Sequence, residues 1–394
     1  MDCHPASIRF RMRPWPAGAG AIFASIALAL ALPDCSAAQE HPPAPAAASP
    51  APAPAARLWG LEWHLLVEAS NTYNFNRPAS GANSYRVFDV EHKSWRFDLA
   101  ELSVLRAAEP LGFQVDLVGG KDVPLMASYG TRNTDLVDFR QAFLSWKPGT
   151  SGFEVRAGKF VTTCGYESIP DWSNQNPNFS NSFLFGYAIP YTHTGVRLIF
   201  PFSPTFTLLA GANRGWDKWK DNNDAPSYEL SATWTPGPAS SFIVSTHHGP
   251  EQSGNKDDWR HLYDFVATFK ASAATSVGFN IDYASESGAS LVHPGRNAKW
   301  YGAAGYLIMT FDPKWNASLR LEYFNDRDGS RTGVSQELTE TDLTVDWKLS
   351  DDLMIRFDGR VDQSSELIFP KQDQKRERLV KNQPTFGLAF VFHL

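Results

Sequence analysis

The first residue that could do chemistry is His193, in the segment Tyr191-Thr192-His193-Thr194-Gly195. A histidine acts as a general base in acyl transfer when a nucleophile and an orienting carboxylate are held beside it. No serine nucleophile stands at a matching spacing in the sequence. We therefore expect no catalytic residues and no enzymatic activity, and we keep a hydrolase as the less favoured alternative.

Two further clusters have side chains that bind metal ions in other proteins. His247 and His248 are adjacent, but successive side chains of a strand point to opposite faces, so they make a poor pair of ligands. Residues 221–224 read Asp-Asn-Asn-Asp, an oxygen-rich loop without the spacing of a calcium-binding loop. The sequence thus predicts no metal site and no cofactor.

Charged residues recur in the middle of apolar segments. In a dry core such charges are very costly unless they are paired, whereas along a water-filled channel they are hydrated. They carry both signs in near balance, and a strongly selective filter needs a one-sided set of charges, so we expect weak ion selectivity. The predicted pore-lining residues are Arg96, Asp98, Asp116, Arg156, Arg197, Glu229, Asp264, Asp282, Arg320, Glu322, Asp346, Lys348, Arg356, Asp358 and Arg360.

These charges alternate with apolar residues at a period of two. Residues 277–283, for example, read Val-Gly-Phe-Asn-Ile-Asp-Tyr. A β-strand places successive side chains on opposite faces, so each such segment has one apolar and one polar face. After residue 40 there is no run of about 18 apolar residues, which excludes a helical membrane protein.

The alternating segments predict sixteen strands. Their expected ranges are 60–73, 94–107, 112–121, 138–147, 152–163, 192–201, 205–213, 227–235, 240–247, 261–271, 274–285, 299–311, 315–325, 338–349, 352–361 and 384–394. Every second connection is short, such as Pro236-Gly237-Pro238, and the others, such as 74–93 and 164–191, are long and polar. A soluble β-sandwich has no reason to keep that order. We expect an all-β, antiparallel, up-and-down transmembrane β-barrel with short periplasmic turns and long extracellular loops.

The N-terminal part of the chain indicates export. Three arginines before residue 14, an apolar stretch at 17–32 and Ser36-Ala37-Ala38 form the pattern of a secretory signal peptide at 1–38. A lipoprotein signal ending at Cys35 is the alternative. Residues 39–57 are rich in Pro and Ala and are predicted to be a disordered tether before a barrel domain at 58–394.

Removal of that signal leaves one cysteine, Cys164, so no intramolecular disulfide framework is expected. It also removes three arginines and two aspartates, which takes the formal net charge from −6 to −7. No basic block remains in the chain, so nucleic acid is not an expected partner.

Aromatic residues gather where the predicted strands end. One set lies beside the short turns: Trp146, Phe200, Trp234, Phe311, Trp315 and Trp347. The other lies beside the long loops: Tyr73, Trp95, Trp216, Trp259 and Trp300. Amphipathic rings prefer the headgroup region, so these sets predict two aromatic girdles in contact with outer-membrane lipid.

The last strand alternates apolar residues up to a C-terminal Leu394, from Phe386 onward. This pattern resembles the terminal signature of barrels that the outer-membrane barrel assembly machinery inserts. The usual last residue of that signature is Phe, so Leu394 is a departure from it. We expect the machinery to be a partner through this strand.

Six segments, in their order along the chain, resemble the OmpL-like family of β-barrel porins. They are Tyr73-Asn74-Phe75-Asn76-Arg77-Pro78, Gln141-Ala142-Phe143-Leu144-Ser145, Ala157-Gly158-Lys159-Phe160, Pro190-Tyr191-Thr192-His193-Thr194-Gly195-Val196-Arg197, Asn213-Arg214-Gly215-Trp216-Asp217 and Asp221-Asn222-Asn223. The resemblance spans nearly all of residues 60–394. It implies a porin of the bacterial outer membrane and brings no catalytic or ligand-binding residues with it.

The favoured hypothesis is therefore a passive, water-filled porin for small hydrophilic solutes. A second hypothesis is a channel that prefers sugars or organic acids, in which the loop 164–190 folds inward. An outer-membrane hydrolase is the third, and a homo-oligomer is an open possibility. The candidate residues for a constriction formed by this loop are Trp172, Asn174, Asn176, Asn178 and Phe179.

Overall fold

The computed structural model describes residues 56–58, 60–126, 136–173, 176–374 and 376–394. The predicted signal peptide and most of the predicted tether lie outside these residues, so both stay predictions. Within the described part of the chain, no helix combines the length and the apolarity needed to cross a membrane.

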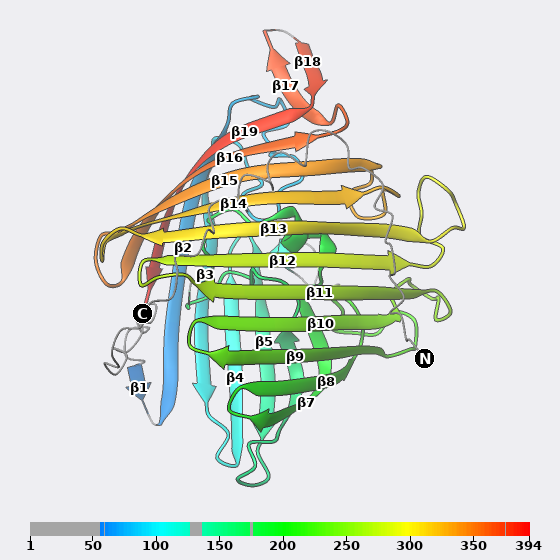
Figure 1. Ribbon diagram of the computed structural model, residues 1–394. Coiled ribbons are helices and arrows are strands. Elements are labelled where there is room, and N and C mark those ends of the chain that lie inside the picture. Colours follow the sequence, from blue (N-terminus) through cyan, green and yellow to red (C-terminus); the bar gives the residue numbers. More distant parts are fainter. Residues whose placement is uncertain (1–55, 59, 127–135, 174–175, 375) are drawn as a thin grey trace, which may run out of the picture. The chain divides into compact units, whose positions relative to one another are not determined.

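Sixteen antiparallel strands form one closed ring (Figure 1). They are β2 (Leu61–Asn74), β3 (Trp95–Arg106), β4 (Leu111–Gly119), β5 (Val137–Trp146), β6 (Glu154–Val161), β7 (Thr192–Ser203), β8 (Phe206–Asn213), β9 (Ser227–Gly237), β10 (Ser240–Pro250), β11 (Trp259–Lys270), β12 (Thr275–Glu286), β13 (Ala298–Thr310), β14 (Trp315–Asp326), β15 (Gln336–Lys348), β16 (Leu353–Ser364) and β19 (Asn382–His393). Each pairs with the next along the chain. The ring closes where β19 pairs with β2, with His393 opposite Leu66. The predicted sixteen-stranded barrel is confirmed, and its closure gives each of the sixteen strands a partner on both sides.

Short turns and long loops alternate along the barrel, as predicted. The turns at one rim are 107–110, 147–153, 204–205, 238–239, 271–274, 311–314 and 349–352. The loops at the other rim are 75–94, 120–136, 162–191, 214–226, 251–258, 287–297, 327–335 and 365–381. The first and last strands of the barrel begin and end at the short-turn rim, because His393 of β19 lies opposite Leu66 of β2.

The two faces of the barrel wall differ in polarity, and the polar face is the buried one. On β12, Phe279, Ile281 and Tyr283 are 39%, 50% and 43% exposed, whereas Asn280 and Asp282 between them are 2% and 1% exposed. Exposing large apolar side chains to water costs roughly 25 cal/mol per Å². The outer face therefore suits lipid, and the polar face is turned toward the interior of the ring.

Two of the four register shifts in the described strands lie away from the turns and interrupt the period of two as β-bulges. In β3, Asp98 and Leu99 are both buried, and the register with β2 shifts beside them. In β5, Arg140 and Gln141 are both buried where the register with β4 shifts. A bulge inserts one extra residue into one strand, so the inward-facing positions change parity beyond it. The sequence prediction assumed one parity for each strand and missed both shifts.

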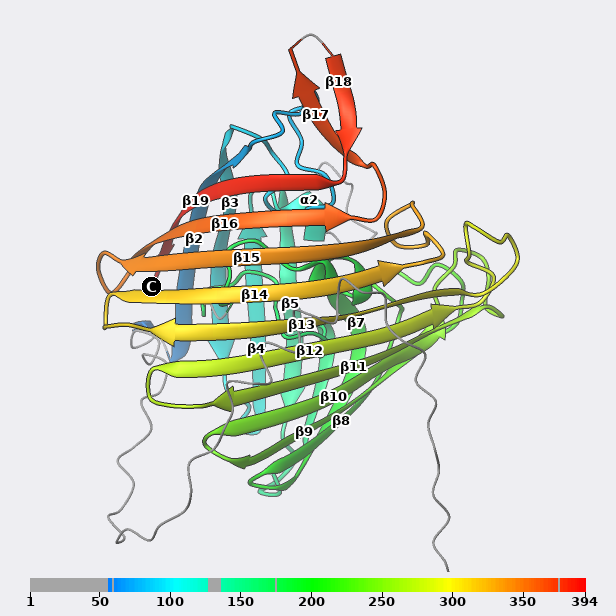
Figure 2. The ribbon, with the colours of Figure 1, turned by 45° about the horizontal axis from the view of Figure 1, so that its top comes forward.

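Short elements occupy the remaining segments. A three-residue strand, β1 (Ala56–Leu58), pairs with β2, and a short helix, α2 (Val123–Met126), follows β4. A π-helix, η1 (Leu184–Ala188), lies in the loop between β6 and β7. The loop after β16 forms a hairpin of β17 (Phe369–Asp373) and β18 (Arg376–Val380), which projects beyond the barrel strands (Figure 2). The sequence prediction placed residues 56–57 of β1 in the disordered tether and left the other segments as irregular loops.

Two tryptophans that were predicted for the outer girdle lie inside the structure instead. Trp216 is 6% exposed and Trp300 is 0% exposed. The Trp300 indole donates a hydrogen bond to the Ala188 carbonyl at 3.1 Å, so the loop between β6 and β7 satisfies its polar N–H. Trp95 and Trp259 are exposed, as expected for residues of a girdle.

Candidate functional site

The loop between β6 and β7, residues 162–191, enters the interior of the barrel, and we call it the inner loop. Its backbone and side chains bond to inward-facing residues of β12 to β16 on one side of the barrel. On the other side they bond to inward-facing residues of β3 and β5. The inner loop therefore crosses the bore and is the central feature of the candidate channel.

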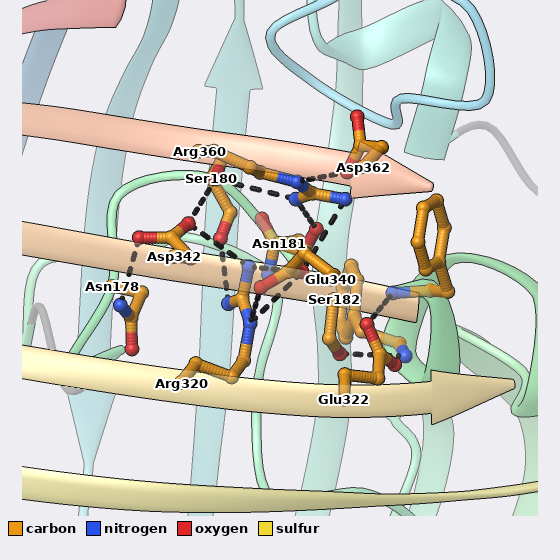
Figure 3. A network of polar contacts seen from close by, with 12 residues as sticks. Asn178, Ser180, Asn181, Ser182, Arg320, Glu322, Glu340, Asp342, Arg360 and Asp362 are labelled. Atoms are coloured by element: carbon orange, nitrogen blue, oxygen red, sulfur yellow. Dashed lines mark hydrogen bonds and ion pairs between the residues drawn. The ribbon is translucent and has the colours of Figure 1, made fainter. Parts of the chain in front are cut away.

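Arg320 on β14 anchors the inner loop to the wall (Figure 3). Its guanidinium donates to the Glu167 carboxylate at 2.6 Å and to the Ser180 carbonyl at 2.7 Å. The same group pairs with Glu340 at 2.8 Å and Asp342 at 3.1 Å on β15. The Arg320 side chain is 0% exposed. One cation thus neutralises acids of both the loop and the wall, which is the pairing that buried charge requires.

Arg360 and Arg356 on β16 bind the inner loop through its backbone. Arg360 donates to the Asn181 carbonyl at 2.6 Å and pairs with Asp362 at 2.7 Å (Figure 3). Arg356 donates to the Asn176 carbonyl at 3.0 Å. Carbonyls of irregular buried backbone need partners, and a guanidinium supplies up to five donors. The wall arginines therefore substitute for the secondary structure that this part of the loop lacks.

Glu322 on β14 holds the start of the π-helix η1. Its two carboxylate oxygens accept hydrogen bonds from the backbone N–H groups of Phe183 at 2.8 Å and Leu184 at 2.6 Å. The first N–H groups of a helix have no partner within the helix, so the acid satisfies two donors that would otherwise be buried alone.

On the opposite wall, the inner loop is fixed by stacking and by a second ion-pair group. The Trp172 ring stacks on His64 of β2 with centroids 3.5 Å apart, and the backbone N–H of Trp172 donates to the Glu101 carboxylate at 2.9 Å. Arg140 of β5 pairs with Glu101 at 2.6 Å and with Asp171 of the loop at 2.9 Å. The loop is therefore tied down at both ends of its path across the bore.

A second loop, residues 75–94, packs against the inner loop. Arg86 pairs with Asp362 at 2.9 Å and also with Asp89 of its own loop. The rings of Phe88 and Phe185 lie 6.0 Å apart, so the contact between the two loops also has an apolar part. The Arg86 side chain is 0% exposed, which places this ion pair inside the packed loops.

Glycines of the wall provide space for side chains of the inner loop. A Cβ atom at Gly278 of β12 would lie 2.4 Å from the Tyr166 ring, and one at Gly302 of β13 would lie 2.7 Å from Leu184. Such distances are shorter than van der Waals contact, so any larger residue at these positions would displace the loop. The fit between wall and loop is therefore steric as well as electrostatic.

The structure places thirteen of the fifteen predicted pore-lining residues in buried positions on the inner side of the wall. The exceptions are Arg156 and Lys348, which are partly exposed. The sequence prediction expected these charges to be hydrated, but several of them are ion-paired to each other or to the loop, as Arg197 is to Glu229 at 2.8 Å. Ion pairs between wall strands and the packing of several loops against the inner face are the physical reasons for the difference. Whether these residues line the solute path stays a prediction.

The asparagines of the constriction prediction are engaged with the protein itself. The Asn178 amide donates to Asp342 at 3.0 Å, and the Asn176 amide donates to the Ser168 carbonyl at 2.7 Å. Asn174 lies outside the described residues. The inner loop thus uses these amides for contacts with itself and with the wall, and the constriction itself stays a prediction.

The described histidines and acids of the interior form no metal centre with three or more protein ligands. Among the described residues, no group of three or more His, Cys, Asp or Glu side chains can hold a metal ion. His193 is 1% exposed, its ring stacks on His247 at 4.8 Å, and its Nδ1 lies 3.3 Å from the Gly215 carbonyl. This environment gives His193 a packing role, with the ring held between neighbours.

Cys164 lies at the start of the inner loop and is buried. Burial raises the pKa of its thiol well above the usual value, and the nearby negative charges of Asp264 and Asp282 raise it further. The thiolate is the reactive form of cysteine, so this side chain is poorly reactive while the loop stays in place.

The sequence prediction missed the residues that hold the inner loop. Glu340 and Asp342 share the inward parity of Asp346 on β15, so the alternation could have revealed them. Glu101 has the opposite parity to Asp98 because of the bulge between them, and no local signal marks it. Glu167 lies in an irregular loop, where the sequence does not indicate which way a side chain points.

The model of a protein family described as "Putative beta-barrel porin-2, OmpL-like" matches residues 60–394. The match spans most of the chain, so this protein belongs to that family and is a porin of the bacterial outer membrane. A comparison with curated proteins gives no match.

Solved structures with the same fold include three bacterial porins or channels. OprB of Pseudomonas putida superposes with a TM-score of 0.59 at 13% identity, covering 85% of this chain and 94% of that one. An anion-selective porin from Comamonas acidovorans gives 0.58 at 10% identity, with 85% and 99% covered. The outer membrane channel DcaP of Acinetobacter baumannii gives 0.57 at 9% identity, with 85% and 97% covered. At these identities the likeness shows the barrel fold.

Proposed function

We propose that this porin is a passive, weakly ion-selective channel for small hydrophilic solutes, narrowed by its inner loop. The observation that carries the proposal is the inner loop itself, which crosses the bore and is fixed to both walls by buried ion pairs. A closed barrel of this strand number is wide enough to leave an aqueous bore once side chains are placed. A fixed loop across such a bore narrows it. Solutes then pass by diffusion alone, without an energy source.

The proposed solute path runs between the inner loop and the wall of β4 to β8. Inward-facing residues of that wall, such as Gln114, Arg156 and Leu209, keep partial exposure. The Arg156 side chain is 34% exposed, whereas the anchoring side chains of Arg320 and Arg360 are 0% exposed. A path on this side would meet few free charges, because most inward-facing arginines already have acidic partners.

Weak selectivity follows from this pairing. Arg197 is bound to Glu229 through two hydrogen bonds of 2.8 Å, and Arg156 is bound to Glu154 at 2.6 Å. Paired charges of opposite sign present a small net field to a passing ion, and salt screens what remains over about 10 Å at 0.1 M. Neither cations nor anions should therefore be strongly excluded.

Planar bilayer recording tests the proposal. Purified, refolded protein should add stepwise, ohmic conductance with no energy source, and the reversal potential in a salt gradient should be small. Liposome swelling should then rank neutral sugars and amino acids by size, with little regard to their chemistry. A folded barrel without conductance would overturn the channel proposal, and swelling that follows one solute class regardless of size would favour the substrate-preferring alternative.

The remaining proposals concern the parts of the molecule that surround the channel. We expect residues 1–38 to be removed on export, residues 39–57 to form a tether, and β19 to be recognised by the barrel assembly machinery. We also expect the long-loop rim to face the cell exterior. The buried setting of His193 supports the absence of hydrolase activity, since a catalytic base must reach a substrate.

A further inference from the structure

The adjacent residues His247 and His248 have different partners on the two sides of the barrel wall. His247 points inward, where its ring stacks on His193, and it is 1% exposed. His248 points outward and lies directly opposite His261 of the next strand, β11. His247 and His248 cannot bind one ion together because they face opposite sides of the wall. Each instead pairs with a histidine of another strand, His247 with His193 and His248 with His261.

The outer pair brings two ring nitrogens together. The Nδ1 atoms of His248 and His261 lie 3.0 Å apart, and the rings are inclined at 52° with centroids 5.2 Å apart. Both side chains are partly exposed on the outer face. In the absence of a metal ion, the N–H of one imidazole donates a hydrogen bond to the unprotonated Nδ1 of the other.

We propose that His248 and His261 form a cross-strand chelate for one Cu²⁺ or Ni²⁺ ion. Metal–nitrogen bonds are about 2.0–2.1 Å long, so a nitrogen separation of 3.0 Å corresponds to an angle of about 90° at the metal. That angle belongs to square-planar or tetragonal coordination, which Cu²⁺ and Ni²⁺ prefer, rather than to the tetrahedral geometry of Zn²⁺. Water fills the remaining positions, since the pair lies near the long-loop ends of β10 and β11 and not in the middle of the lipid-facing wall.

The position of the pair favours access from solution. His248 lies near the end of β10 that leads into a long loop, and His261 is the third residue of β11 after that loop. The ring of Trp259, which is exposed, lies 6.2 Å from that of His261, and the ring of Tyr263 lies 5.3 Å from that of His248. The chelate therefore sits among aromatic residues at the rim, where water reaches the barrel surface.

The inner pair serves as an internal contrast. His193 and His247 stack with ring planes only 19° from parallel and centroids 4.8 Å apart. Nitrogen lone pairs lie in the plane of each imidazole ring, so those of stacked rings run side by side and do not converge on one ion. The barrel thus has one histidine pair arranged for packing and one arranged for chelation.

Copper titration of the refolded, untagged porin tests the proposal. Electron paramagnetic resonance should show one tetragonal Cu²⁺ per chain with two nitrogen ligands. His248→Ala and His261→Ala should each weaken Cu²⁺ binding about 100-fold, the gain expected when a second ligand is held at high effective concentration. His293→Ala, which removes an exposed loop histidine, is the matched control and should leave binding unchanged.

Heat-modifiable migration on gels must first show that each variant is folded, which is expected because both side chains face away from the interior. Binding that survives either single substitution, or a spectrum with one nitrogen ligand, would overturn the chelate. Tighter binding of Zn²⁺ than of Cu²⁺ would also overturn it, because the geometry would then be tetrahedral.

Discussion

Inward-facing arginines on two sides of the barrel wall differ in their exposure and in their ion-pair partners. On β14 and β16, Arg320 and Arg360 are 0% exposed and bind the inner loop and the acids around it. On β6, Arg156 has a 34% exposed side chain and pairs with Glu154 of its own strand. The same alternation of residues produced both walls, but one serves as the support of a loop and the other faces the proposed path.

This difference separates structural charge from functional charge. We expect a buried arginine with several acidic partners to hold the inner loop in place, and a partly exposed arginine on the proposed path to act on passing ions. The two kinds of arginine should therefore respond to substitution in different measurements, unfolding for the first and reversal potential for the second. The following three experiments test that separation.

Replacement of Arg320 with alanine should have the largest effect. It leaves Glu167, Glu340 and Asp342 without their shared cation, and removal of one partner from a buried ion pair costs about 3–5 kcal/mol. Urea unfolding should show this loss, and single-channel conductance should rise because the loop is released. Arg156→Ala is the control and should cost less than about 1 kcal/mol. Equal losses for the two variants would contradict the distinction between the walls.

Replacement of Gly278 with alanine should have an intermediate effect, because the new methyl group would meet the Tyr166 ring at 2.4 Å. Overpacking of this kind costs roughly 1–3 kcal/mol and should push the start of the inner loop off the wall. Maleimide labelling of Cys164, slow in the parent because the thiol is buried and its pKa is raised, should accelerate.

Gly305→Ala is the matched control, since its Cβ would meet only Phe279 at 3.9 Å, an ordinary contact. Its labelling rate should equal that of the parent. Unchanged labelling in Gly278→Ala would show that the loop does not depend on the space at this glycine.

The smallest expected effect is that of Arg156→Glu on ion selectivity. The substitution reverses one partly exposed charge, so the reversal potential in a salt gradient should move toward cation preference by a few millivolts at most, given screening over about 10 Å at 0.1 M salt. Arg106→Glu makes the same charge change at an exposed strand end and should leave the potential unchanged. A large shift in both variants would point to surface charge rather than to the bore.

The sequence was a good guide to the wall and a poor guide to the bore. The period of two and the alternating connection lengths predicted the sixteen strands, their order and the polar inner face. They could not predict that Trp300 turns inward, because its strand end looks the same as that of Trp95 in the sequence. The bulges at Asp98 and Arg140 were equally hidden, since one extra residue leaves the local composition unchanged.

The sequence by itself determined the class of the protein, because strand periodicity is a local property that neighbouring residues establish. Only the tertiary structure decided which charged side chains are buried in ion pairs and which reach water. Arg320 and Glu167 lie 153 positions apart in the chain, and nothing local to either one indicates that they form a 2.6 Å ion pair. Closure of the ring brings distant strands around one interior, and the inner loop then buries charges that periodicity alone assigns to water.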